Sequence, residues 1–75
     1  MDREKILDLL EKREYKELKE ELGNLYPVDI AEFLEYVDEK QMLPIFRLLG
    51  KEEAAETFSY MDSDQREILI NALTD

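Results

Sequence analysis

The chain has 75 residues, of which 20 are acidic and 10 basic, and its formal net charge is −10 at pH 7. This length allows one domain with a thin hydrophobic core. The acid excess argues against binding to nucleic acid or anionic membrane surfaces, because both attract Lys and Arg. Cys and His are both absent, which excludes disulfides and thiolate chemistry and removes the usual general base near neutral pH.

Apolar residues at helical spacing predict two helices in the first third of the chain. Asp2 is placed to cap the first helix, and Gly23 stands where a C′ glycine would stop the second. The apolar positions are Ile6, Leu7 and Leu10 in the first helix, then Tyr15, Leu18 and Leu22 in the second. The Glu- and Lys-rich stretch between residues 11 and 21 is interpreted as a solvated face with i,i+4 pairs.

Two further helices are predicted in the middle of the chain. Pro27 suits a first helical position, and Asp38 with Gln41 forms a capping-box pattern. Gly50 is expected to end the fourth helix, and Pro44 to kink it or to push its regular part later. The apolar positions are Ile30, Ala31, Leu34 and Val37, then Met42, Ile45, Phe46 and Leu49.

The last third of the chain repeats this pattern after a shift of 24 residues. The matching pairs are Ala31 with Ala55, Glu32 with Glu56, Tyr36 with Tyr60, Asp38 with Asp62, Gln41 with Gln65 and Leu49 with Leu73. A fainter copy lies upstream, where residues 6–11 overlay residues 30–35. The predicted unit is therefore a helical hairpin that occurs three times, and stacked hairpins bury their apolar faces against their neighbours.

The predicted fold is all-α, with about six short helices in three helical hairpins that form one domain over residues 1–75. The last predicted helix carries apolar residues on more than one side, namely Ile68, Leu69, Ile70, Ala72 and Leu73. A terminal repeat should have a polar outer face. We therefore expect the domain to be truncated at its C-terminal side, with more helices following.

Three segments, in order, resemble the cytosolic N-terminal domain of MgtE-type magnesium transporters. They are residues 26–34 (YPVDIAEFL), 45–49 (IFRLL) and 51–58 (KEEAAETF), and the resemblance extends over roughly residues 14–75. It implies a right-handed superhelix of short helices on the cytoplasmic side of the cell membrane. It also implies a homodimeric full-length protein, in which bridging Mg²⁺ docks this domain on the CBS domains of the same transporter and favours the closed pore.

The resemblance assigns one site residue by motif: Glu56, the Glu of the A-A-E signature, corresponds to an interfacial Mg²⁺ ligand. Asp29 and Glu32 are three residues apart on one predicted helix, and Glu53 and Glu56 occupy the matching places one repeat later. Neighbouring repeats would place these pairs side by side as an acidic strip, which suits a hard cation. The alternative is an ordinary solvated helix face. Since the remaining ligands belong to other domains, we expect weak Mg²⁺ binding, or none, by the isolated segment.

Two functions stay open at this point. The leading hypothesis is a regulatory Mg²⁺-sensing domain of a magnesium transporter, without enzymatic activity. The alternative is a helical protein-interaction scaffold with no metal role. The two repeat tyrosines, Tyr36 and Tyr60, are interpreted as packing between hairpins, with contact to a partner as the alternative. The net charge favours the first hypothesis, because residues 1–19 are neutral overall and residues 20–75 carry the whole excess of −10.

Overall fold

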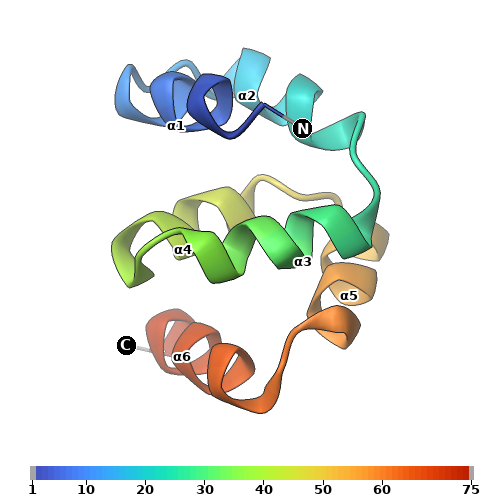
Figure 1. Cartoon of the computed structure of the whole chain (residues 1–75). Coiled ribbons are helices and arrows are strands. Elements are labelled where there is room, and N and C mark those ends of the chain that lie inside the picture. Colours follow the sequence, from blue (N-terminus) through green and yellow to red (C-terminus); the bar gives the residue numbers. More distant parts are fainter. Residues whose placement is uncertain (1, 75) are drawn as a thin grey trace.

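The computed structural model describes residues 2–74, which form six α-helices and no strand (Figure 1). The all-α prediction with six short helices is therefore confirmed. The helices are α1 (Arg3–Glu11), α2 (Tyr15–Gly23), α3 (Pro27–Tyr36), α4 (Glu39–Arg47), α5 (Lys51–Tyr60) and α6 (Ser63–Thr74). None of these helices has the length and the apolar character needed to cross a bilayer.

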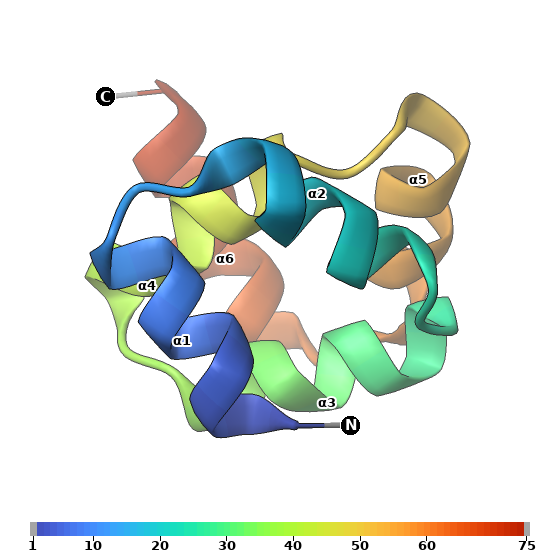
Figure 2. The ribbon, with the colours of Figure 1, turned by 90° about the horizontal axis from the view of Figure 1, so that it is seen from above.

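The helix boundaries reproduce the repeat in all three hairpins. The first helix of each hairpin starts at residue 3, 27 or 51, and the second at residue 15, 39 or 63, so equivalent helices start 24 residues apart. The first helices of the second and third hairpins, α3 and α5, lie against each other, as do the second helices α4 and α6. Figures 1 and 2 show the hairpins stacked in chain order, an arrangement compatible with a superhelix.

The core follows the repeat as well. Leu9 of α1, Phe33 of α3 and Thr57 of α5 are equivalent, and all three are buried. Phe33 is missing from the apolar stripe predicted for its helix, yet it is completely buried. The other fully buried apolar side chains are Leu18, Leu22, Ile30, Leu34, Ile45 and Leu69. One continuous cluster of buried residues thus runs through all three hairpins.

Acidic residues cap several helix starts as predicted. The Asp2 carboxylate accepts a hydrogen bond from the backbone N–H of Lys5, at 3.0 Å. At the start of α4, Asp38 accepts from the N–H of Gln41 at 2.9 Å, and the Gln41 side chain accepts from the N–H of Asp38 at 3.2 Å. This completes the predicted capping box. Each such cap satisfies backbone donors that have no partner within the helix.

The repeated cap at the start of α6 is only half formed. Asp62 accepts from the backbone N–H of Gln65 at 2.8 Å. The side-chain oxygen Oε1 of Gln65, in contrast, is buried and has no hydrogen-bond partner among the described residues. The sequence pattern therefore predicts the carboxylate half of this cap correctly but not the glutamine half.

The glycines and Pro44 differ from their predicted roles. Gly23 is the last residue of α2, with Asn24 as the C-cap, and Gly50 is the N-cap of α5 rather than the end of α4. No described glycine has a positive φ, so neither forms a left-handed C′ cap. Of the two effects expected of Pro44, a later regular part is not found, because the helix begins at Glu39 and continues through Pro44 to Arg47.

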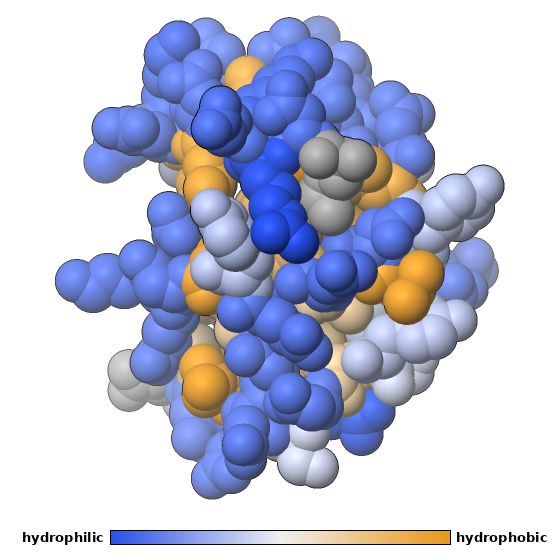
Figure 3. Space-filling view, in the orientation of Figure 1, coloured by the Kyte–Doolittle hydropathy of each residue, from blue (hydrophilic) through white to orange (hydrophobic). Residues whose placement is uncertain are grey.

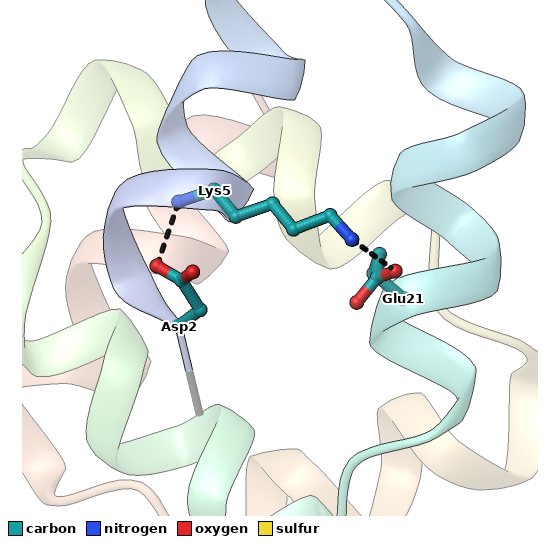
Figure 4. A network of polar contacts seen from close by, with 3 residues as sticks. All are labelled: Asp2, Lys5 and Glu21. Carbon is teal, nitrogen blue, oxygen red and sulfur yellow. Dashed lines mark hydrogen bonds and ion pairs between the residues drawn. The ribbon is translucent and has the colours of Figure 1, made fainter.

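An ion pair ties α1 to α2 in the first hairpin (Figure 4). The ammonium group Nζ of Lys5 lies 3.0 Å from Oε1 of Glu21. The hydrogen bond to Glu21 and the charge of its carboxylate raise the pKa of Lys5 above its ordinary value of 10.5. Both partners are exposed to a large extent, so this pair orients the two helices more than it stabilises the fold.

Arg66 has a structural role that the helical pattern does not predict. Its guanidinium donates from Nε to the carbonyl of Phe58 at 3.0 Å and from Nη2 to the carbonyl of Ser59 at 2.8 Å. Both carbonyls belong to the last turn of α5, which has no basic residue of its own. Arg66 of α6 therefore caps the C-terminus of α5 from the neighbouring helix.

Candidate interfacial metal site

The four predicted acidic residues lie on the two helices that contact each other most closely. Asp29 and Glu32 are on α3, and Glu53 and Glu56 are on α5 at the matching places one repeat later. Glu32 and Glu56 are exposed, whereas Asp29 and Glu53 are half-buried. The predicted pairs therefore occupy adjacent helices, with their second members facing solvent.

A basic residue from the first hairpin lies close to Glu32. Arg3, the first residue of α1, has Nη2 at 3.9 Å from Oε1 of Glu32. The same guanidinium lies over the ring of Tyr36, with its central carbon 4.5 Å from the ring centroid. Arg3 thus bridges the first and second hairpins and offsets the charge of the α3 carboxylate.

The repeat puts a different residue opposite Glu56. Since equivalent residues are 24 apart, Glu56 corresponds to Glu32 and Pro27 corresponds to Arg3. Pro27 has no charge, and Glu56 forms no ion pair with any residue that the structure describes. Of the two equivalent glutamates, the one in the third hairpin keeps an unpaired, exposed carboxylate.

The carboxylates do not by themselves form a metal site. Within residues 2–74, no group of three or more acidic side chains comes close enough together to hold a metal ion. Mg²⁺, however, usually keeps several waters and takes only one or two protein carboxylates. Glu56 can therefore supply one ligand of a site that is completed by another molecule or domain, and this chemistry fits the residues present.

The two repeat tyrosines are less buried than predicted. Tyr36 and Tyr60 each remain 58% exposed, so more than half of each side chain lies outside the packing between hairpins. Tyr36 still contacts the preceding hairpin through the guanidinium of Arg3, and its ring lies 6.3 Å from that of Phe33. In α3 and α5, the residue at the Phe33 position points into the core and is buried. The tyrosine at the C-terminal end of each of these helices stays partly in contact with solvent.

Comparison with known proteins gives one match. A model of the family described as MgtE intracellular N domain matches residues 25–75. The match begins at the second hairpin, so the first hairpin lies outside it, and it is shorter than the stretch from residue 14 suggested by the motifs. No curated protein and no solved structure matches the chain.

Proposed function

This chain belongs to the MgtE intracellular N domain family, and from that membership we propose that it acts as a Mg²⁺-sensing regulatory domain. The family consists of intracellular domains of magnesium transporters and is not an enzyme class. In the proposed mechanism, Mg²⁺ bridges this domain to the CBS domains of the same transporter and favours the closed pore. The full-length transporter is proposed to be a homodimer, with this domain on the cytoplasmic side of the cell membrane.

The observation that best supports this proposal is the contrast between Glu56 and Glu32. Both are exposed carboxylates at the same repeat position, but among residues 2–74 an ion-pair partner, Arg3, lies beside Glu32 and none lies beside Glu56. An exposed carboxylate without a partner retains its full attraction for a divalent ion. Glu56 is also the residue that the A-A-E motif identifies as the interfacial ligand. The lack of an ion pair leaves Glu56 available for this role, although most acidic residues of the described chain share it.

The charge distribution supplies the energetic reason for ion-dependent docking. Residues 20–75 carry a net charge of −10, so an acidic partner surface is repelled when Mg²⁺ is scarce. Two unit charges 4 Å apart interact with about 1 kcal/mol in water and about 4 kcal/mol near a protein surface. A bridging Mg²⁺ turns this repulsion into attraction, and because the ion binds only the docked state it shifts the equilibrium towards that state.

The proposal is tested in the full-length transporter by comparing Glu56→Gln with Glu32→Gln. Both variants remove one negative charge from an exposed helix position, but only the first removes the proposed ligand. We expect Glu56→Gln to raise the Mg²⁺ concentration at which the pore closes by about tenfold, which corresponds to 1.4 kcal/mol. Glu32→Gln should leave this concentration within about twofold of the wild type. Equal shifts in both variants, or no shift in either, would contradict the sensing role of Glu56.

The scaffold hypothesis makes a different prediction for the same protein. If the domain holds a protein partner without metal, docking survives EDTA and is insensitive to Glu56→Gln. If the Mg²⁺-sensing proposal is correct, EDTA releases the domain from the CBS domains. Cross-linking of the domain to the CBS domains with and without EDTA separates the two outcomes.

A further inference from the structure

Hollows along α1, α4 and α6, which lie on one side of the molecule (Figure 1), form a groove, and Figure 3 shows apolar patches between hydrophilic residues along that side. Two hollows, of about 660 and about 490 Å³, meet at Lys40 and Pro44 of α4. The first extends towards the last turn of α6 and the second towards the last turn of α1. The groove therefore crosses all three hairpins, although α5, which carries Glu56, does not line it.

The floor of the groove is apolar. Its apolar lining consists of Leu7 and Leu10 from α1, Leu43 and Pro44 from α4, and Ala72 from α6. All five residues are only partly buried, so part of their surface remains in contact with water. Covering such surface is favourable by about 25 cal/mol for each Å².

The rim of the groove is rich in hydrogen-bond acceptors and negative charge. Glu11, Asp38 and Glu39 contribute carboxylates, and Lys40 is the one cation among the lining residues of these two hollows. The last turn of α6 carries no basic residue, so the negative end of its helix dipole is uncompensated by its own side chains, whereas α1 has Lys12 as its C-cap.

Pro44 adds a further acceptor to the groove. Proline has no backbone N–H, so the carbonyl of Lys40, four residues earlier in α4, lacks its usual helical donor. Pro44 and Lys40 line both hollows, so this carbonyl belongs to a residue at their junction. A ligand that supplies a donor there would satisfy a backbone group that the helix itself leaves without a partner.

We propose that this groove binds an amphipathic helix of a partner protein, with Lys or Arg along the edges of its apolar face. The apolar floor matches the apolar stripe of such a helix, and the acidic rim and free carbonyl match its cationic flanks. At 1.5 Å per residue, a helix of about 14 residues is about 21 Å long, which fits within the longest dimension of the molecule, 28 Å. Docking in the groove needs no metal and does not involve Glu56, so its test is independent of the test of Mg²⁺ sensing.

The test uses the ¹⁵N-labelled 75-residue chain and a synthetic amphipathic peptide of about 14 residues, with Leu at i, i+3, i+4 and i+7 and Lys elsewhere. The titration is followed by NMR in about 0.15 M salt with EDTA, where exposed charges are screened beyond about 8 Å. We expect amide shifts to concentrate at Leu7, Leu10, Lys40, Leu43 and Ala72. A peptide with Glu in place of Lys should not bind.

Two variants of α6 separate groove binding from general attraction to an acidic protein. Ala72→Arg places a bulky cation in the groove, whereas Ile70→Arg makes the same charge change at an exposed position of the same helix outside it. We expect Ala72→Arg to weaken peptide binding by at least about tenfold and Ile70→Arg by less than about threefold. The proposal would be overturned if both variants weakened binding equally, if the amide shifts spread over the acidic surface, or if the Lys peptide did not bind.

A second pair of variants avoids any change to the packing of α6. Glu39→Gln removes a rim carboxylate in the first turn of α4, and Glu52→Gln removes an exposed one in the first turn of α5. Weaker binding of the Lys peptide to Glu39→Gln than to Glu52→Gln would support the groove. Identical binding by the two variants would contradict a role for its acidic rim.

Discussion

Replacing Arg66 by Met tests how much one side chain contributes to holding the third hairpin together. The guanidinium donates two hydrogen bonds to the last turn of α5, and its central carbon lies 5.3 Å from the centroid of the Phe58 ring. Met42 occupies the equivalent place in α4 and is buried. Arg66→Met therefore introduces the same apolar side chain that α4 has at this repeat position. It removes the two hydrogen bonds and the cation–π contact.

The expected loss follows from these contacts. A hydrogen bond from a charged donor contributes about 1.5–3 kcal/mol when it is well shielded from water, and a partly exposed cation–π contact about 0.5–1 kcal/mol. Arg66 is only partly buried and its bond to Ser59 is exposed, so we count only the part-buried bond to Phe58, at about 1.5 kcal/mol, and the cation–π contact, at about 0.5 kcal/mol. We therefore expect Arg66→Met to lower the free energy of unfolding by about 2 kcal/mol. For 75 residues, an unfolding entropy of about 2.1 cal/mol/K per residue converts this into a decrease in Tm of about 13 °C.

Urea denaturation followed by circular dichroism gives the free energy directly, and a thermal scan gives the Tm. The matched control is Arg47→Met, since Arg47 is exposed in the last turn of α4 and forms neither an ion pair nor a side-chain hydrogen bond with another described residue. It should cost no more than about 0.5–1 kcal/mol through the helix dipole. The capping role of Arg66 would be refuted if the two variants lost the same stability.

Three further changes test other features of the fold. Thr57→Val should raise the free energy of unfolding by about 1 kcal/mol in urea denaturation, because it replaces a fully buried hydroxyl without a partner by an isosteric methyl group; a loss of stability would mean that the hydroxyl is hydrogen-bonded. Asp38→Ala should cost about 1–2 kcal/mol by the same assay and more than Asp62→Ala, since only the first cap is complete; equal losses would contradict this. The raised pKa of Lys5 means that the folded state holds its proton more tightly, so the Glu21 pair acts fully below pH 10.5 and is lost as pH rises through the higher folded value. The difference in Tm between wild type and Lys5→Met should therefore shrink in alkaline solution, and a constant difference would argue against this.

Local signals account for most of what the sequence predicts about this fold. The caps at Asp2 and Asp38 depend on residues three positions away, and the helix start at Pro27 depends on that residue itself. The internal repeat then relates the three hairpins, because each unit must bury the same face against its neighbours. These features involve short distances along the chain and the structure confirms them, whereas the local signals at Gly23, Gly50 and Gln65 are wrong.

Contacts between distant segments account for what the sequence does not predict. Arg66 occupies a repeat position that is apolar in the other hairpins, and only the proximity of the end of α5 explains a cation there. In the same way, the A-A-E motif identifies Glu56, but its lack of a cation becomes apparent only once Arg3 is seen beside Glu32. In the sequence, the repeat aligns Arg3 with Pro27 and so indicates that Glu56 has no equivalent of the Arg3 cation. This can be recognised only from the structure, in which Arg3 lies beside Glu32.

The regular stacking of the hairpins also has a kinetic consequence. Contacts between helices occur mainly within a hairpin or between neighbouring ones, so the residues that meet are seldom far apart along the chain. Proteins with such local contacts fold within microseconds to milliseconds. Opening of one hairpin disrupts only the contacts with its neighbours. Amide hydrogen exchange should therefore be slowest in α3 and α4, which have a hairpin on either side, and faster in α1, α2, α5 and α6.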